Sequence, residues 1–90
     1  MEKAIITVIG KDKVGIIAKV TNTLAECSIN VLDITQTILQ DMFTMMMIVD
    51  ISKSDMDISA IRDNLTATGT ELGVEIRIQH EDIFNSMHRI

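Results

Sequence analysis

A chain of 90 residues, 47% of them hydrophobic, is long enough for one hydrophobic core and too short for two. The mean hydropathy of +0.28 and the absence of proline exclude an intrinsically disordered chain and a proline-rich linker. Thirteen acidic residues against eight basic ones give a net charge of −5, and only two residues are aromatic. This composition argues against direct nucleic-acid binding, which requires a cationic face or aromatic stacking platforms.

The single cysteine, Cys27, excludes an intrachain disulfide and a zinc site made of cysteines. The apolar run that follows Met1–Lys3 is too short for a signal peptide. No uncharged stretch reaches the length of a membrane-spanning helix. We therefore expect a cytoplasmic protein with no membrane partner.

The first predicted element is a strand over Ala4–Ile9, because this run is β-branched almost throughout and stops at Gly10. Both of its faces are apolar, which indicates a central strand covered on two sides. After a polar loop the apolar side chains recur at spacings of three and four. This period predicts an amphipathic helix from about Val14 to Glu26.

Two β-prone runs follow, over Val31–Leu39 and Met42–Ile51, and the polar pair Gln40-Asp41 separates them. Two such runs joined by a short polar break predict a β-hairpin. The four methionines of the second run lie on alternating faces of one strand, so they are typical of core or interface packing rather than of a copper site.

The segment Ser54–Asp57 has the pattern Ser-x-x-acid, which predicts a capped start for a second helix. An apolar stripe follows at helical spacing, and Gly73 stands where a C-cap glycine belongs. Gly69 lies inside this pattern and weakens the last turn. The stripe consists of Ile58, Ile61, Leu65, Thr68 and Leu72.

Strict alternation over Val74–Gln79 predicts a fourth strand with one solvent-exposed face. The remaining residues, 81–90, carry apolar side chains on one side of a possible helix, which we expect to dock on the domain or on a partner subunit. Those apolar residues are Ile83, Phe84, Met87 and Ile90.

The element order βαββαβ predicts an α+β, ferredoxin-like sandwich, in which a four-stranded antiparallel sheet carries both helices on one face. A short C-terminal helical tail completes this fold. We expect one domain over residues 1–90, with a core of about residues 3–80 and a tail over residues 81–90.

Several classes of protein share this order of elements but need chemistry that the first loop lacks. A carrier of soft metals needs paired thiolates, and an acylphosphatase-like enzyme needs an arginine, whereas the first arginine here is Arg62. An RNA-recognition module needs aromatic residues on its middle strands, where only Phe43 is present. No nucleophile with a base beside it is evident, so we expect neither an enzyme nor a bound metal or cofactor.

Two short segments, Asp12–Gly15 before the first helix and Ser28–Val31 before the second strand, resemble the signature of the ACT domain family. That signature is an Asp-(Arg/Lys)-Pro-Gly turn followed later by Gly-x-Asn-Ile, and Val14 and Ser28 depart from it. The resemblance covers about residues 3–80. It is nearest to small stand-alone ACT proteins related to the transcriptional regulator of the glycine cleavage system. The matching residues are Asp12, Lys13, Gly15 and Asn30.

The resemblance implies an amino-acid site, and the chemistry of the residues agrees with it. A helix N-terminus accepts a carboxylate, Gly15 allows close backbone approach, Asp12 can pair with an ammonium group, and the Asn30 amide both donates and accepts. The same residues are also typical of a simple cap and turn. The predicted ligand-binding residues are Lys11, Asp12, Lys13, Val14, Gly15 and Asn30.

Asn30 follows the first helix and therefore lies at the far end of that helix from the loop. One ligand can touch both only if a two-fold partner brings the second group across. Apolar side chains on both faces of the first and third strands also predict a homodimer or higher homo-oligomer, paired either by sheet edges or back to back. The resemblance implies side-by-side pairing into an eight-stranded sheet.

We therefore expect a small regulatory module that binds an amino acid and signals through contacts within the oligomer or with a protein partner. The alternative is a ligand-free interaction or assembly protein that retains the ACT fold.

Overall fold

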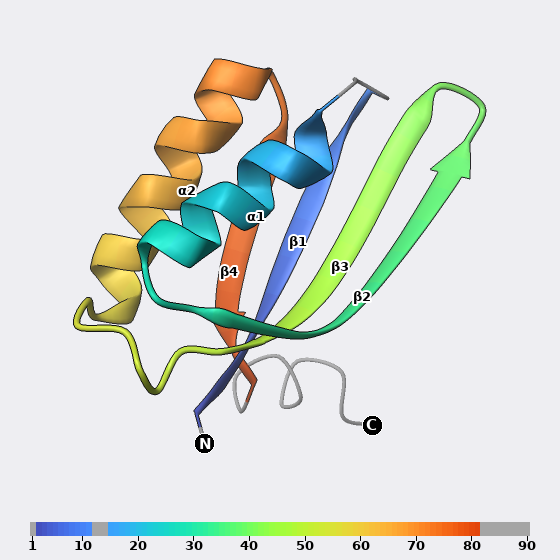
Figure 1. The fold of residues 1–90 in the computed structure, drawn as a ribbon. Coiled ribbons are helices and arrows are strands. Elements are labelled where there is room, and N and C mark those ends of the chain that lie inside the picture. The colour runs from blue at the N-terminus through green and yellow to red at the C-terminus, as the bar shows by residue number, and fades with distance from the viewer. Residues whose placement is uncertain (1, 12–14, 82–90) are drawn as a thin grey trace.

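The computed structural model describes residues 2–11 and 15–81, and its elements follow the order βαββαβ. The strands form one antiparallel sheet in the order β2-β3-β1-β4, and both helices lie against one face of it (Figure 1). The predicted α+β, ferredoxin-like sandwich is confirmed, whereas the predicted tail lies outside the described residues except for Glu81. The elements are β1 (Lys3–Lys11), α1 (Ile16–Glu26), β2 (Asn30–Leu39), β3 (Met42–Asp50), α2 (Ile58–Leu72) and β4 (Glu75–His80).

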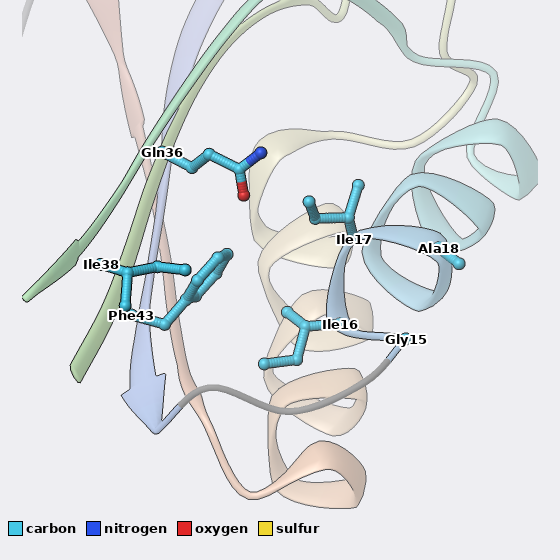
Figure 2. Close-up of a pocket in the computed structure, with 7 residues that line it drawn as sticks. All are labelled: Gly15, Ile16, Ile17, Ala18, Gln36, Ile38 and Phe43. Carbon is cyan, nitrogen blue, oxygen red and sulfur yellow. The ribbon is translucent and has the colours of Figure 1, made fainter. Parts of the chain in front are cut away.

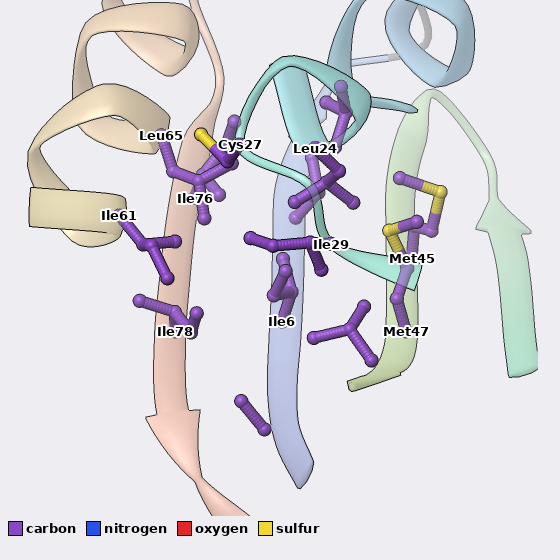
Figure 3. Close-up of a cluster of buried hydrophobic side chains, with 14 of the residues drawn as sticks. Ile6, Leu24, Cys27, Ile29, Met45, Met47, Ile61, Leu65, Ile76 and Ile78 are labelled. Atoms are coloured by element: carbon purple, nitrogen blue, oxygen red, sulfur yellow. The ribbon is translucent and has the colours of Figure 1, made fainter. Parts of the chain in front are cut away.

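The core lies between the sheet and the two helices (Figure 3). Every second side chain of a strand points toward the helices. The apolar side chains of each helix recur at spacings of three and four, so they lie on the face of the helix that contacts the sheet. Two of the four neighbouring methionines, Met45 and Met47, are fully buried here, which confirms that they pack in the core. The largest fully buried side chains are Ile6, Ile16, Leu24, Met45, Met47, Ile61 and Leu65.

The second helix begins at a different cap from the one predicted. The N-cap is Asp57, whose carboxylate accepts a hydrogen bond from the Ala60 amide at 2.9 Å. Ser54 instead stabilises the turn before the helix, because its hydroxyl accepts from the Met56 amide at 3.2 Å. The predicted C-cap is correct, since Gly73 has the left-handed backbone conformation (φ 74°) that glycine adopts without strain.

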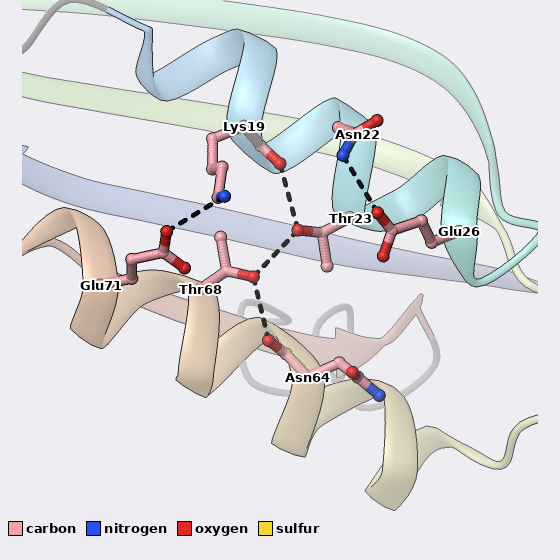
Figure 4. A network of polar contacts seen from close by, with 7 residues as sticks. All are labelled: Lys19, Asn22, Thr23, Glu26, Asn64, Thr68 and Glu71. Atoms are coloured by element: carbon pink, nitrogen blue, oxygen red, sulfur yellow. Dashed lines mark hydrogen bonds and ion pairs between the residues drawn. The ribbon is translucent and has the colours of Figure 1, made fainter.

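The two helices contact each other through polar side chains above the core (Figure 4). The hydroxyls of Thr23 and Thr68 lie 2.9 Å apart, and each also lies 3.1 Å from a carbonyl oxygen of its own helix. Nearer the start of α1, Lys19 pairs with Glu71 at 3.1 Å. These contacts join α1 to α2 and direct the only basic side chain of α1 toward α2.

The face of the sheet opposite the helices is partly exposed in the single subunit. Ile5 on β1 is buried, but Ile9 farther along the same strand is 37% exposed, and Met42 and Met46 on β3 are also exposed. Among the described residues, no helix covers this face (Figure 1). β1 is an interior strand, as the sequence predicts, and the covering of its second face by a partner subunit stays a prediction.

Candidate functional site

The predicted site residues fall at two opposite ends of the sheet. Lys11, the last residue of β1, pairs with Met42 at one end of β3, whereas Asn30 pairs with Asp50 at the other end. Eight residues of extended chain separate these two positions, which is about 26 Å. Gly15 precedes α1 at the Lys11 end. Asp12, Lys13 and Val14 lie outside the described residues.

The start of α1 offers backbone donors to a ligand. Gly15 is the N-cap residue, with a left-handed backbone (φ 86°) that most side chains disfavour. Its carbonyl accepts the first helical hydrogen bond from the Lys19 amide at 2.9 Å. No side chain among the described residues caps this helix. The N–H groups of the first turn are therefore available to a carboxylate.

A pocket of about 440 Å³ lies between this first turn and the strands β2 and β3 (Figure 2). Figure 2 shows the Gln36 amide pointing from β2 toward Ile17, with Ile38 and Phe43 projecting from the strands on the same side. The pocket is lined by Gly15, Ile16, Ile17, Ala18, Gln36, Ile38 and Phe43.

The position of Gln36 and Ile38 depends on an irregularity in β2. The register between β2 and β3 shifts between Val31 and Asp33, so that one extra residue is accommodated in β2. Beyond this shift, Gln36 pairs with Met45 and Ile38 pairs with Phe43, both of which face the helices. The two pocket residues of β2 consequently face the same side of the sheet as α1.

Most of these pocket residues were not among the residues predicted for the site. The prediction followed the loop before the first helix and Asn30, and Gly15 is the one residue it shares with the pocket. The sequence did contain a signal for the β2 residues of the pocket. Ile34, Gln36 and Ile38 are spaced two apart and alternate with threonines, so they face the same side of a strand.

Within its own subunit, Asn30 lies at the end of the sheet where β3 ends and β1 begins. Its sheet partner, Asp50, is 7% exposed, and one of its carboxylate oxygens accepts from the Ser52 hydroxyl at 2.7 Å, the Ser52 amide at 3.0 Å and the Glu2 amide at 3.3 Å. These hydrogen bonds, that of the Ser52 hydroxyl first, hold the pKa of Asp50 below its ordinary value. The hydrogen bonds of the Asp50 carboxylate therefore hold the start of β1 against the end of β3.

Neither a reactive thiol nor a metal cluster is found among the residues that the structure describes. Cys27 is buried, and this burial, with a smaller effect from the charge of Glu26, raises the pKa of its thiol and keeps it protonated. Within residues 2–11 and 15–81, no three histidine, cysteine, aspartate or glutamate side chains gather as a metal site would require. Nor is any helix in that part of the chain long and apolar enough to cross a membrane.

A four-stranded antiparallel sheet with both helices on one face, in the order βαββαβ, defines a small ferredoxin-like domain. The profile of the ACT domain matches residues 2–79, so the chain belongs to the ACT domain family. ACT domains are regulatory and commonly bind amino acids.

A UPF0237 protein of Clostridium acetobutylicum is 58% identical over 88 residues, which cover 98% of this chain and 99% of that protein. Among solved structures, an ACT domain protein from Streptococcus pneumoniae is 47% identical, with a TM-score of 0.82 over 92% of this chain and 93% of that one. A crystal structure described as a glycine cleavage system transcriptional repressor has a TM-score of 0.76. It is 22% identical and matches 88% of this chain and 45% of that one, so this likeness concerns the fold alone.

Proposed function

We propose that this protein is a regulatory module that binds a free amino acid and passes the bound state to a second copy of itself or to a protein partner. The observation that carries this proposal is the pocket between the uncapped start of α1 and the side chains of Gln36 and Ile38 on β2. Membership of the ACT domain family supports the same ligand class.

Each part of an amino acid has a partner in this proposal. The first-turn N–H groups at Gly15 and beyond take the α-carboxylate, because they lack a side-chain cap among the described residues and carry the positive end of the helix dipole. Asp12 remains our proposed partner for the ammonium group, together with its neighbours Lys11, Lys13 and Val14 in the loop. Asn30 of a second subunit reaches the same ligand across a two-fold axis.

The proposed dimer forms through the free edge of β2. All ten residues of this strand are exposed, although half of them are large and apolar. An exposed apolar edge strand is a ready template for pairing with another chain. Pairing two copies of β2 joins the two sheets into one of eight strands. The apolar residues of this edge strand are Val31, Leu32, Ile34, Ile38 and Leu39.

The other edge of the sheet is protected, which favours β2 as the interface. The guanidinium of Arg62 on α2 donates to the Ile78 carbonyl of β4 at 3.2 Å, and the exposed side chains of Glu75 and Arg77 on β4 pair with each other at 2.7 Å. Charged side chains and occupied carbonyls discourage strand addition at an edge.

Thermal unfolding of the protein with each of the twenty amino acids tests the binding proposal. A ligand present at one hundred times its dissociation constant adds about 2.7 kcal/mol to the free energy of unfolding. We expect one amino acid or one chemically related group to raise the Tm, with the dissociation constant then measured by calorimetry. A flat response to all twenty would contradict the proposal.

A lysine placed at the proposed interface tests the assembly. We expect Ile34→Lys on β2 to convert the dimer to monomer in light scattering, because it puts a charge on the pairing edge. Met46→Lys is a matched control, since Met46 is 40% and Ile34 41% exposed, but Met46 faces the uncovered side of the sheet away from either edge. A dimer lost in Met46→Lys and kept in Ile34→Lys would place the interface on that side instead.

The alternative, a ligand-free assembly protein, is favoured by the same apolar edge, since pairing through β2 requires no ligand. It predicts a stable dimer in light scattering together with no response to any amino acid. The two measurements above therefore separate the two functions.

A further inference from the structure

The described side chains around the pocket are apolar with one exception. Isoleucines line both sides of it, at Ile17 on α1 and Ile38 on β2, and Phe43 lies between them on β3. The Gln36 amide is the one polar side chain among the described lining residues. Among the described lining residues, a charged ligand side chain would find only the neutral Gln36 amide to replace the water that it loses.

From this lining, and resting on the proposed function, we infer that the bound amino acid carries an apolar side chain such as that of leucine, isoleucine, valine or methionine. The side chain of the bound amino acid lies against Ile17 and Ile38. The carboxylate and ammonium groups of the ligand stay at the rim of the pocket near Gly15.

The charged residues that the structure describes near the pocket do not line it. Lys19, the basic residue of α1, is held by Glu71 on α2 and so faces away from β2 (Figure 4). The nearest charged residues on the β2–β3 hairpin are Asp33 and Asp41, and neither lines the pocket. Among the described residues, no carboxylate or ammonium group is placed to pair with the side chain of a bound lysine, glutamate or aspartate.

Ile38 is the residue that most directly reports on this inference. It is 55% exposed although it lies on the helix side of the sheet beside Phe43, because β2 extends past the edge of α1. A ligand side chain placed there covers apolar surface that the domain alone leaves in water. One methylene more or less in an apolar pocket changes affinity about tenfold or more, so leucine should bind far more tightly than alanine.

Calorimetry on the full chain with leucine, alanine, serine and glutamate tests the inference. We expect leucine to bind at least tenfold more tightly than alanine, and serine and glutamate to bind more weakly than alanine. Ile38→Ser should weaken leucine binding at least tenfold and reduce the preference for leucine over alanine. The matched control is Met46→Ser, an exposed apolar residue of β3 that faces the other side of the sheet and lies outside the proposed β2 interface. It should leave leucine binding within about twofold of the unsubstituted protein.

The outcomes distinguish this inference from the proposed function. Tightest binding of serine, glycine or a charged amino acid would overturn the apolar ligand and leave amino-acid binding standing, as would unchanged leucine affinity in Ile38→Ser. No binding of any amino acid would overturn both. Light scattering on Ile38→Ser and Met46→Ser separates a lost contact from a lost dimer, because the inference expects weaker leucine binding in an Ile38→Ser protein that is still a dimer.

Discussion

Replacing Gly69 by alanine should destabilise the protein, although alanine is the better helix former. A Cβ at position 69 would lie 2.8 Å from the Val74 carbonyl oxygen and 3.2 Å from Ile76 Cγ1. The Val74 amide donates to the Gly69 carbonyl at 2.9 Å, which draws the chain after α2 back over the helix. Val74 cannot move away from Gly69, because its side chain packs closely on Gly10. A Cβ at position 10 would lie 2.6 Å from Val74 Cγ1.

The magnitude follows from two opposing effects. Alanine gains about 1 kcal/mol over glycine inside a helix. Against this stands overpacking, which costs about 1–3 kcal/mol, together with a strained hydrogen bond between Gly69 and Val74 worth about 1 kcal/mol. We expect Gly69→Ala to lower the free energy of unfolding by about 1–3 kcal/mol, which lowers the Tm of a domain of this size by roughly 5–25 °C.

Urea unfolding at one fixed protein concentration measures this change, since the stability of an oligomer depends on concentration. Thr66→Ala is the matched control, because Thr66 is exposed on the same helix and alanine there gains propensity without a clash. Equal or higher stability in Gly69→Ala than in the unsubstituted protein would refute the packing argument.

A double-mutant cycle identifies the atom responsible. Val74→Ala removes the Cγ1 atom that obstructs a side chain at Gly10, but it leaves the carbonyl oxygen that obstructs one at Gly69. Val74→Ala should therefore partly rescue Gly10→Ala and should be additive with Gly69→Ala.

Two further predictions concern the ends of the sheet and the chain. The pKa of Asp50 is lowered in the folded state. The ionised carboxylate therefore contributes to the free energy of unfolding above the ordinary aspartate pKa of about 4. This contribution is lost as the pH falls through the lowered pKa. Asp50→Asn should remove that part of the acid dependence, so unfolding curves of the variant and the unsubstituted protein should converge at low pH; a constant gap would contradict the assignment. Truncation after Asp82 removes the apolar tail that we predict to dock, and should lower the Tm or change the oligomeric state. Identical melting and light scattering for the truncated and full chains would show that the tail is a free appendage.

The sequence was sufficient for the order and type of the elements, because each carries a clear period and β-branched or capping residues at its ends. Its errors lie at boundaries that tertiary contacts determine. The predicted first strand stops at Ile9, but β1 continues to Lys11, since Gly10 and Lys11 still pair with β3. The cap of α2 moved from Ser54 to Asp57 because both residues can cap a helix, and only the packing of the first turn chooses between them.

The pocket was harder to predict, because its β2 wall depends on one irregular residue pair. Val31 pairs with buried Val49, so strict alternation from Val31 would turn Asp33, Thr35 and Leu39 toward the helices. The register shift before Asp33 exchanges the two faces of the strand, as a one-residue slip does. It brings Gln36 and Ile38 to the side of α1 instead. The alternation of isoleucine and threonine along β2 contains this information, but a resemblance based on the loop before α1 directs attention to Asn30, at the other end of the sheet.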